Sequence, residues 1–395
     1  MTERDQPTAQ ILFMNQVCGP LFRELVEDVA KELGPCEILT GTRMSGNSDL
    51  RVLQAPAYDR TSPLRRIWTW TTFAALAFVR SLSGPRTKLL FLVSNPPFLG
   101  LIGWLASLLT GRRYVVLVYD LYPGMLENLG RLQRAGLVAR LWHGMNRLVW
   151  GRAACVITIG DEMAANIQPH LIGHKPTPIV VIPNWADSTF VRPIPKSENP
   201  FARRTGEVDR LTILYSGNLG HSHDLTPLLD VAREVREEWK DVSFLIIGAG
   251  VRYGEVEERI RAEGLTNVRL LPLQPEQDLP YTLTTGDVAI VTFEAGSEGY
   301  MVPSKSYYYL AAGCALVVIA SSDNSISRIV AEHGCGISVP ANSPDLLKQA
   351  IARFRGDSDF LARCKSRARA VQESSFDRGN TRHYARLLHR VLGTQ

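Results

Sequence analysis

Short apolar runs recur along the whole chain, and each is long enough for one buried strand. They are rich in β-branched and aliphatic residues and contain few polar positions. The first series lies at residues 11–15, 37–40, 88–93, 114–119, 155–159 and 178–183. The second series lies at residues 211–216, 242–248, 267–273, 287–293 and 315–320. Continuous rather than alternating apolar positions predict parallel strands that are covered on both faces.

Amphipathic stretches with helical spacing lie between these runs. In residues 21–33, 225–239 and 343–355, apolar residues recur every three or four positions. Strands that alternate with helices predict an α/β fold, here with two Rossmann-like, doubly wound sheets. Ligands in such folds bind outside the carboxyl ends of the strands.

The two series are separated by residues 184–200, which are rich in proline and show no periodicity. This composition is typical of a linker. The length of 395 residues also exceeds that of one ordinary hydrophobic core. We therefore expect an N-terminal domain over 1–185, a linker over 186–200, a second domain over 201–375 and a terminal segment over 376–395. The two domains are expected to face each other across a cleft.

The composition is that of a globular protein, with 45% hydrophobic and 21% charged residues. The six cysteines show no CxxC pair or regular spacing, which favours buried, reduced thiols in a cytosolic protein. The first ten residues contain no apolar segment of the kind that marks a cleaved signal peptide. We therefore expect a cytoplasmic location.

Residues 60–152 form a basic, tryptophan-rich window. It contains 13 Arg or Lys against two acidic residues, and five of the seven tryptophans. Its two apolar runs, 67–79 and 98–109, are shorter than the roughly 20 residues that span a bilayer. Such segments, flanked by arginine and tryptophan, favour helices that lie in the interface of an anionic membrane. The alternative is a pair of ordinary core helices beneath a basic surface.

The residues of this window that we expect to contact a membrane or an acceptor carry cationic or indole side chains. They are Arg65, Arg66, Trp68, Trp70, Trp104, Arg112 and Arg113. The expected location is therefore peripheral, on the inner face of the cell membrane. The window carries no recognised nucleic-acid-binding motif, so nucleic acid is not an expected partner.

Four loops that follow predicted strands carry candidate site residues; three are glycine-rich turns or helix starts suited to an anionic ligand, and the fourth holds the carboxylate of Asp120. Glycine-rich turns and helix N-termini bind anions through backbone amides and the helix dipole. A lysine in the first turn of a helix is unfavourable for the helix alone, which indicates an anion nearby. A diphosphate site is the interpretation that accounts for the three glycine-rich turns or helix starts and the lysine together. The candidates are Gly19, Asp120, Gly217, Asn218, Gly220, His223, Ser304 and Lys305.

Other patterns exclude several classes of site. His221 and His223 have no third metal ligand at a suitable spacing. The Asp357-Ser358-Asp359 sequence lies between two helical patterns, so a solvated turn is favoured. Residues 248–250, Gly-Ala-Gly, lack the full dinucleotide fingerprint. We expect no metal and no cofactor.

Taken together, these motifs resemble a GT-B-fold glycosyltransferase of the retaining family 4 kind, in the branch that makes bacterial exopolysaccharide, capsule or O-antigen units. The segment 302–320, VPSKSYYYLAAGCALVVIA, is the most specific match, because in that branch a PSK turn begins the helix beneath the donor nucleotide. The other matching segments are 94–107, 119–130, 181–187 and 215–220.

The sequence departs from that family at several expected positions. The second of two glutamates, which in the family holds the nucleotide ribose, falls on Tyr308. Asn218 and His223 stand where the family has the Arg and Lys that neutralise the donor diphosphate. Tyr119 stands in place of the His before Asp120. These changes put the donor's identity and the usual ribose contact in question.

The resemblance implies a metal-independent hexosyltransferase that uses a nucleotide-sugar donor. Lys305 and Asp120 are the expected catalytic residues; the former stabilises the leaving phosphate and the latter orients a hydroxyl. In this fold the N-terminal domain binds the acceptor. The basic window therefore indicates a lipid-linked acceptor, a saccharide on polyprenyl diphosphate. By analogy with the family, the helix at 376–395 packs back on the first domain.

Two alternatives remain open. A nucleotide-sugar 2-epimerase shares the fold, but would need acid and base groups beyond Asp120 and Glu298. A non-catalytic partner subunit would account for the missing glutamates.

Overall fold

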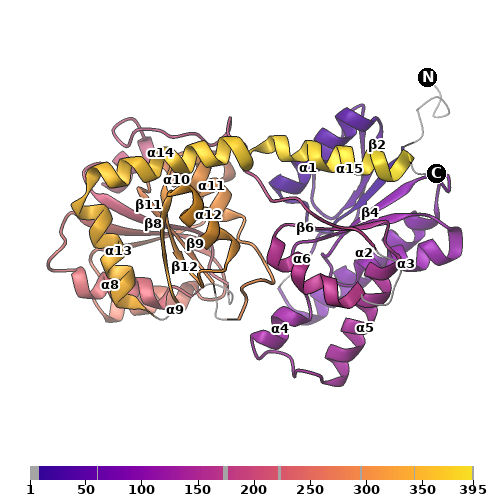
Figure 1. Cartoon of the computed structure of the whole chain (residues 1–395), viewed down its shortest axis with the longest axis horizontal. Coiled ribbons are helices and arrows are strands. Elements are labelled where there is room, and N and C mark those ends of the chain that lie inside the picture. The colour runs from indigo at the N-terminus through magenta and orange to yellow at the C-terminus, as the bar shows by residue number, and fades with distance from the viewer. Residues whose placement is uncertain are drawn as a thin grey trace. The chain divides into compact units, whose positions relative to one another are not determined.

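A computed structural model of the chain describes residues 9–59, 61–171, 177–220, 224–293, 296–341 and 343–393. The chain divides into two compact units (Figure 1). The first contains Met1–Pro183 and Gly379–Gln395, and the second contains Asn184–Arg378.

The first unit is built on a seven-stranded parallel sheet with the order β3-β2-β1-β4-β5-β6-β7. Its strands are β1 (Ile11–Met14), β2 (Cys36–Thr40), β3 (Leu50–Gln54), β4 (Leu89–Val93), β5 (Tyr114–Val118), β6 (Cys155–Thr158) and β7 (Ile179–Val181). Its helices are α1 (Pro20–Leu33), α2 (Pro63–Leu82), α3 (Leu99–Thr110), α4 (Gly124–Asn128), α5 (Leu137–Arg152), α6 (Asp161–Ile167), η1 (Gln168–Leu171) and α15 (Thr381–Gly393).

The second unit repeats this plan with a six-stranded parallel sheet, in the order β10-β9-β8-β11-β12-β13. Its strands are β8 (Leu211–Asn218), β9 (Val242–Ala249), β10 (Val268–Pro272), β11 (Val288–Thr292), β12 (Ala315–Ile319) and β13 (Gly336–Val339). Its helices are α7 (Pro200–Thr205), α8 (Thr226–Val235), α9 (Tyr253–Ala262), η2 (Glu276–Asp278), α10 (Leu279–Thr284), α11 (Lys305–Ala311), α12 (Ser325–His333), α13 (Pro344–Gly356), α14 (Ser358–Ser375) and η3 (Arg378–Asn380), whose last two residues lie in the first unit.

Both sheets have the strand order of a doubly wound fold, which confirms the α/β prediction. The order reverses between β1 and β4 in the first unit and between β8 and β11 in the second. Ligands of doubly wound sheets bind at the carboxyl ends of the strands beside this switch point.

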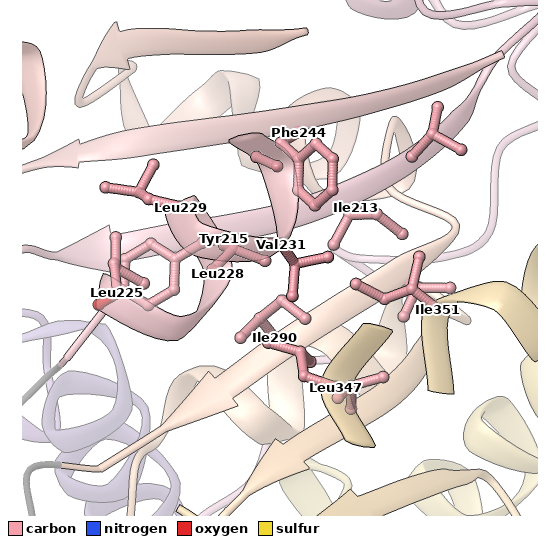
Figure 2. Close-up of a cluster of buried hydrophobic side chains, with 14 of the residues drawn as sticks. Ile213, Tyr215, Leu225, Leu228, Leu229, Val231, Phe244, Ile290, Leu347 and Ile351 are labelled. Atoms are coloured by element: carbon pink, nitrogen blue, oxygen red, sulfur yellow. The ribbon is translucent and has the colours of Figure 1, made fainter. Parts of the chain in front are cut away.

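The central strands are apolar throughout because helices cover both of their faces. In the second unit, Leu225 just before α8 and Leu228 and Leu229 within it share a buried cluster with Ile213 and Phe244 of the sheet (Figure 2). All five side chains are at most 3% exposed. This burial is the main favourable term in folding, and it fixes the strand ends that carry the site.

Residues 186–200, expected to be a linker, lie in the second unit. Asn199 caps α7 by accepting hydrogen bonds from the amides of Phe201 (2.8 Å) and Ala202 (3.2 Å). Its side-chain amide donates to the Tyr281 carbonyl at 2.8 Å. The proline content therefore reflects an irregular strap, with turns at 188–190 and 196–198, that is held by polar contacts.

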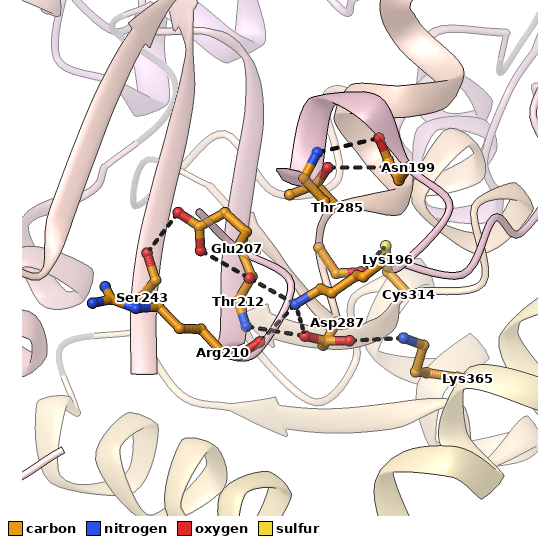
Figure 3. A network of polar contacts seen from close by, with 12 residues as sticks. Lys196, Asn199, Glu207, Arg210, Thr212, Ser243, Thr285, Asp287, Cys314 and Lys365 are labelled. Carbon is orange, nitrogen blue, oxygen red and sulfur yellow. Dashed lines mark hydrogen bonds and ion pairs between the residues drawn. The ribbon is translucent and has the colours of Figure 1, made fainter. Parts of the chain in front are cut away.

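A buried ionic network anchors this strap at the start of strands β8 and β11 (Figure 3). The Asp287 carboxylate pairs with Lys196 of the strap and accepts from Lys365 Nζ at 2.8 Å. It also accepts from the Thr212 amide at 3.0 Å. Burial raises the pKa of the Asp287 carboxyl, but the charges and hydrogen bonds of Lys365 and Lys196 outweigh it and hold that pKa below its usual value.

The C-terminal helix α15 belongs to the first unit. The Thr381 hydroxyl donates to Asp28 of α1 at 3.0 Å, and the Tyr384 ring lies 6.5 Å from that of Phe91 in β4. Within the described residues, no helix has both the length and the apolar composition needed to cross a bilayer.

Candidate functional site

The turn of Gly217–Gly220, which includes the last two residues of β8, meets the start of α11 at the switch point of the second sheet. Gly217 has φ +144°, a backbone conformation that favours glycine. A Cβ atom on Gly217 would lie 3.6 Å from both Cε and Nζ of Lys305. Two residues that the sequence placed in one anion site are therefore in contact range in the structure.

The Lys305 ammonium has a neutral partner. Its Nζ donates to the Tyr215 hydroxyl at 2.8 Å and lies 4.0 Å from the centroid of the Tyr215 ring. Among the described residues it makes no ion pair within 4.0 Å. Lys305 is partly exposed, and desolvation of its ammonium, with no carboxylate to offset it, lowers the pKa of Lys305 to about 7. An anion bound here would restore and stabilise its charge.

The glycines of the turn and of residues 248–250 are explained by close backbone contact. A Cβ on Gly248 would lie 2.2 Å from the Gly217 carbonyl oxygen, and one on Gly250 would lie 2.5 Å from that of Leu219. The Leu219 amide donates to the Ala249 carbonyl at 2.8 Å. A Cβ on Gly220 would lie 2.6 Å from the Asn218 side-chain nitrogen, so this turn admits little change.

The remaining donor-site candidates lie in different environments. Ser304 precedes α11, is exposed, and makes no side-chain capping bond. Tyr308, on the same helix, is partly exposed. Gly19 is the N-cap of α1 at φ −78°, where any residue fits, and no atom lies within 4 Å of its Cβ position. His223 lies outside the described residues, as do His221 and Glu294.

Glu298 has a structural contact that the sequence does not reveal. Its carboxylate accepts from the Ser321 amide at 3.1 Å and from the Ser321 hydroxyl at 2.6 Å. Ser321 follows β12, so the glutamate ties the segment before α11 to the end of that strand. In the described part of the chain, no group of three His, Cys, Asp or Glu side chains is arranged to hold a metal ion.

Asp120 lies in the first unit, directly after β5, and lines a small pocket of about 20 Å³. Burial raises the pKa of this carboxyl to about 6. Tyr122 and Trp142 line the same pocket, and their rings stack with centroids 5.9 Å apart. Asn146 also lines it and donates to the Tyr122 carbonyl at 2.6 Å.

The sequence analysis did not assign Tyr122, Trp142 or Asn146 to this pocket. Tyr122 was detectable, because it stands two residues after Asp120 in the same loop. Trp142 and Asn146 lie on α5, and no spacing in the sequence connects that helix with the end of β5.

The basic window exposes apolar side chains on α2 and on α5. On α2, Leu64 is 80%, Ile67 54% and Trp68 70% exposed, and Arg65 and Arg66 beside them are also exposed. The exposed apolar side chains of α5 were not predicted from the sequence. That helix exposes Leu137, Val138, Leu141 and Leu148.

Not all of the predicted surface contacts lie on this surface. Arg112 is 2% exposed and donates to the carbonyls of Ser81 and Gly84 at the end of α2. The prediction that it contacts a membrane is therefore wrong, because its guanidinium satisfies buried carbonyls. Arg113 is partly exposed and donates to the Leu392 carbonyl at 3.2 Å.

Two of the tryptophans expected to contact a membrane, Trp70 and Trp104, are only partly exposed. Trp70 stacks on Tyr58 with centroids 5.9 Å apart and meets Phe98 edge-on. Its ring is therefore engaged within the first unit, whereas Trp68 points to solvent.

Two family models match successive parts of the chain. "Glycosyl transferase 4-like domain" matches residues 25–185, and "Glycosyl transferases group 1" matches residues 198–371. Together they cover most of both units.

Curated relatives and solved structures agree with these matches. The chain is 28% identical over 258 residues to the probable glycosyltransferase WbjE of Pseudomonas aeruginosa, covering 65% of this chain and 64% of WbjE. It is 25% identical over 338 residues to the putative colanic acid biosynthesis glycosyl transferase WcaI of Escherichia coli K12, covering 83% and 81%. The structure of Anabaena HepE in complex with UDP superposes with a TM-score of 0.70 at 15% identity, covering 96% of this chain and 100% of HepE.

Proposed function

Because this chain belongs to the GT-B glycosyltransferases of the family 4 type, we propose that it moves a hexose from a nucleotide-sugar donor, with retention, to a lipid-linked saccharide. The product is a unit of a cell-surface polysaccharide. WcaI, a relative named for colanic acid biosynthesis, supports this role. HepE, whose structure contains UDP, supports a nucleotide-sugar donor.

The observation that carries the proposal is the unneutralised Lys305 beside the Gly217 turn. A nucleotide-sugar donor leaves as a diphosphate, and the transition state gains negative charge on the departing oxygen. A preorganised cation and backbone amides stabilise that charge most when water is excluded. Lys305, with its pKa lowered to about 7 by desolvation, fits that role because a bound diphosphate would supply the missing counter-charge.

Retention follows if the acceptor attacks on the face from which the diphosphate leaves. The bond between the anomeric carbon and the phosphate oxygen breaks, and a bond from the acceptor oxygen to that carbon forms. The acceptor proton passes to the departing phosphate oxygen, so no protein nucleophile is required. Asp120 holds the acceptor or a sugar hydroxyl in position.

The acceptor proposal draws on the exposed surface of α2 and α5. Apolar side chains beside arginines bind an anionic bilayer by partial insertion and by charge attraction. A protein held on the inner face of the membrane would meet a polyprenyl-linked substrate whose tail stays in the bilayer. One surface then serves both membrane attachment and acceptor supply.

Donor binding is tested by thermal shift with UDP-, GDP- and dTDP-sugars, followed by transfer assays with the best ligand. A ligand at about 100 times its Kd adds about 2.7 kcal/mol of stability, so we expect a rise in Tm of several degrees. Absence of any shift would favour the non-catalytic partner subunit. Release of an epimerised nucleotide sugar without acceptor would favour the 2-epimerase.

Membrane attachment is tested by flotation with anionic liposomes at low salt. We expect the wild type to float and Trp68→Glu combined with Leu141→Glu to remain in the dense fraction, because both changes place charge in the apolar contact. Leu273→Glu is the matched control, since Leu273 is 62% exposed but lies in the second unit. Equal flotation of all three proteins would contradict this surface.

A further inference from the structure

Tyr215 connects the candidate cation with the backbone of the turn. Its hydroxyl accepts from Lys305 Nζ at 2.8 Å and donates to the Asn218 carbonyl at 2.8 Å. The residue is fully buried, and its ring packs beside Leu225 and Leu228 in the core (Figure 2). Packing of the ring therefore fixes the position of the Tyr215 hydroxyl. The two hydrogen bonds of that hydroxyl in turn fix Lys305 Nζ and the Asn218 carbonyl.

The hydroxyl of a second tyrosine, Tyr309, holds Ser216, the residue that follows Tyr215. Tyr309 of α11 accepts from the Ser216 amide at 2.7 Å and donates to the Ser216 carbonyl at 2.9 Å. The helix that carries Lys305 is thereby joined to the end of β8. Tyr309 can hold the turn without Tyr215, which allows the two roles to be separated by mutation.

The neutrality of Tyr215 matters for its role. A carboxylate at this position would form a charge-assisted bond to Lys305 and would compete with an incoming anion. A phenol aims the ammonium through one hydrogen bond and its ring face but leaves the charge uncompensated. Lys305 can then exchange a neutral partner for an anionic one.

The charged group that acts on Tyr215 is a second cation, so it cannot neutralise Lys305. Arg252, before α9, is the charged group whose field acts on Tyr215, and it is itself paired with Glu255 at 3.1 Å and Asp224 at 3.5 Å. Its charge is thus already balanced by acidic partners. Lys305, by contrast, makes no ion pair within 4.0 Å among the described residues, so its charge is available to a ligand.

We propose that Tyr215 is a positioning residue for the donor diphosphate: it holds Lys305 and the Asn218 backbone in the binding geometry and releases Lys305 to the diphosphate. This inference rests on the proposed function. It assigns a specific task to a residue that otherwise has the appearance of an ordinary core tyrosine. The ligand class is a diphosphate, either free or within a nucleotide sugar.

The test measures Kd and KM between pH 6 and pH 9 for Tyr215→Phe, with Tyr281→Phe as control. The probes are inorganic pyrophosphate and the nucleotide sugar that gives the largest thermal shift. We expect Tyr215→Phe to keep its fold and to bind both probes about tenfold more weakly. Loss of the hydrogen bond also disfavours the ammonium, so the alkaline fall in affinity should move to lower pH. Tyr281, which is 38% exposed, should tolerate the change.

Tyr309→Phe separates positioning from stability. It removes the hydrogen bonds to Ser216, so we expect a lower Tm but no change in the pH at which the affinity for the probes falls. If Tyr215→Phe behaves in this way, or binds as the wild type does, the positioning role is wrong even though the donor site stands. If the wild type binds neither pyrophosphate nor any nucleotide sugar, the proposed function fails together with this inference.

Discussion

Replacement of Lys305 by alanine is expected to lower kcat/KM for sugar transfer by about 10²–10³-fold, the effect of removing one preorganised donor to a developing negative charge. Lys305 contacts the Gly217 turn and has a neutral partner. Arg252, whose charge also acts on Tyr215, is already paired with Glu255 and Asp224. The change is measured by steady-state transfer assays with the donor found by thermal shift.

Two further variants make that result specific. Lys305→Met keeps the length of the aliphatic side chain but has no charge, and should be as impaired as the alanine variant. Lys348→Ala removes a lysine that is 36% exposed and pairs with Glu234, and should retain wild-type kinetics. Wild-type transfer by Lys305→Met would exclude a role in stabilising the leaving phosphate.

Replacement of Asp287 by alanine is expected to destabilise the second unit by about 3–5 kcal/mol, because it leaves buried charge without its partner. Lys196 is 12% exposed and Asp287 13% exposed in their ion pair. Water therefore cannot solvate the Lys196 ammonium in place of the missing carboxylate. The loss corresponds to a fall in Tm of about 10 °C for a unit of this size. Urea unfolding and calorimetry measure it.

The control for Asp287 is Asp241→Ala, which removes an exposed ion pair. Asp241 and Arg355 are 53% and 35% exposed, and such pairs contribute about 0–1 kcal/mol. The Asp287 effect also has a predicted pH dependence. Since its native pKa lies below the usual value, the stabilisation is present above about pH 4 and is lost as pH falls through the native pKa. The gap between wild type and variant should therefore shrink in acid, and a constant gap would argue against the ionic role.

The central strands were predictable from the sequence because both of their faces are buried. The edge strands β3 and β13 were missed. β3 carries Arg51 and Gln54 on a partly exposed strand, and β13 begins with Gly336. Neither has the continuous apolar run that identifies a strand buried on both faces.

The candidate site was predictable where it depends on local backbone chemistry. Gly217 and Lys305 were found because a turn with positive φ favours glycine and because a lysine in the first turn of a helix is unusual. Tyr215 and Arg112 could not be assigned in this way. A tyrosine in a strand has the pattern of a core residue, and an arginine beside exposed ones has the pattern of a surface residue, until tertiary structure shows the partners of each.

The structure of residues 186–200 also could not be predicted from the local sequence pattern. Proline and the absence of periodicity are typical of a linker, but they also describe an irregular strap. What distinguishes the two is the set of long-range contacts made by Lys196 and Asn199. Such contacts depend on residues about 80–90 positions away and leave no periodic signal.

The most direct test of the account is the number of protons taken up when the nucleotide sugar binds at pH 8. Calorimetric titration in buffers with different ionisation enthalpies gives this number. With a free pKa of about 7, Lys305 is mostly neutral at pH 8, and a bound diphosphate should restore its proton. We predict uptake of close to one proton by the wild type and none by Lys305→Met. Binding without proton uptake, or equal uptake by both proteins, would contradict the claim that Lys305 holds the diphosphate.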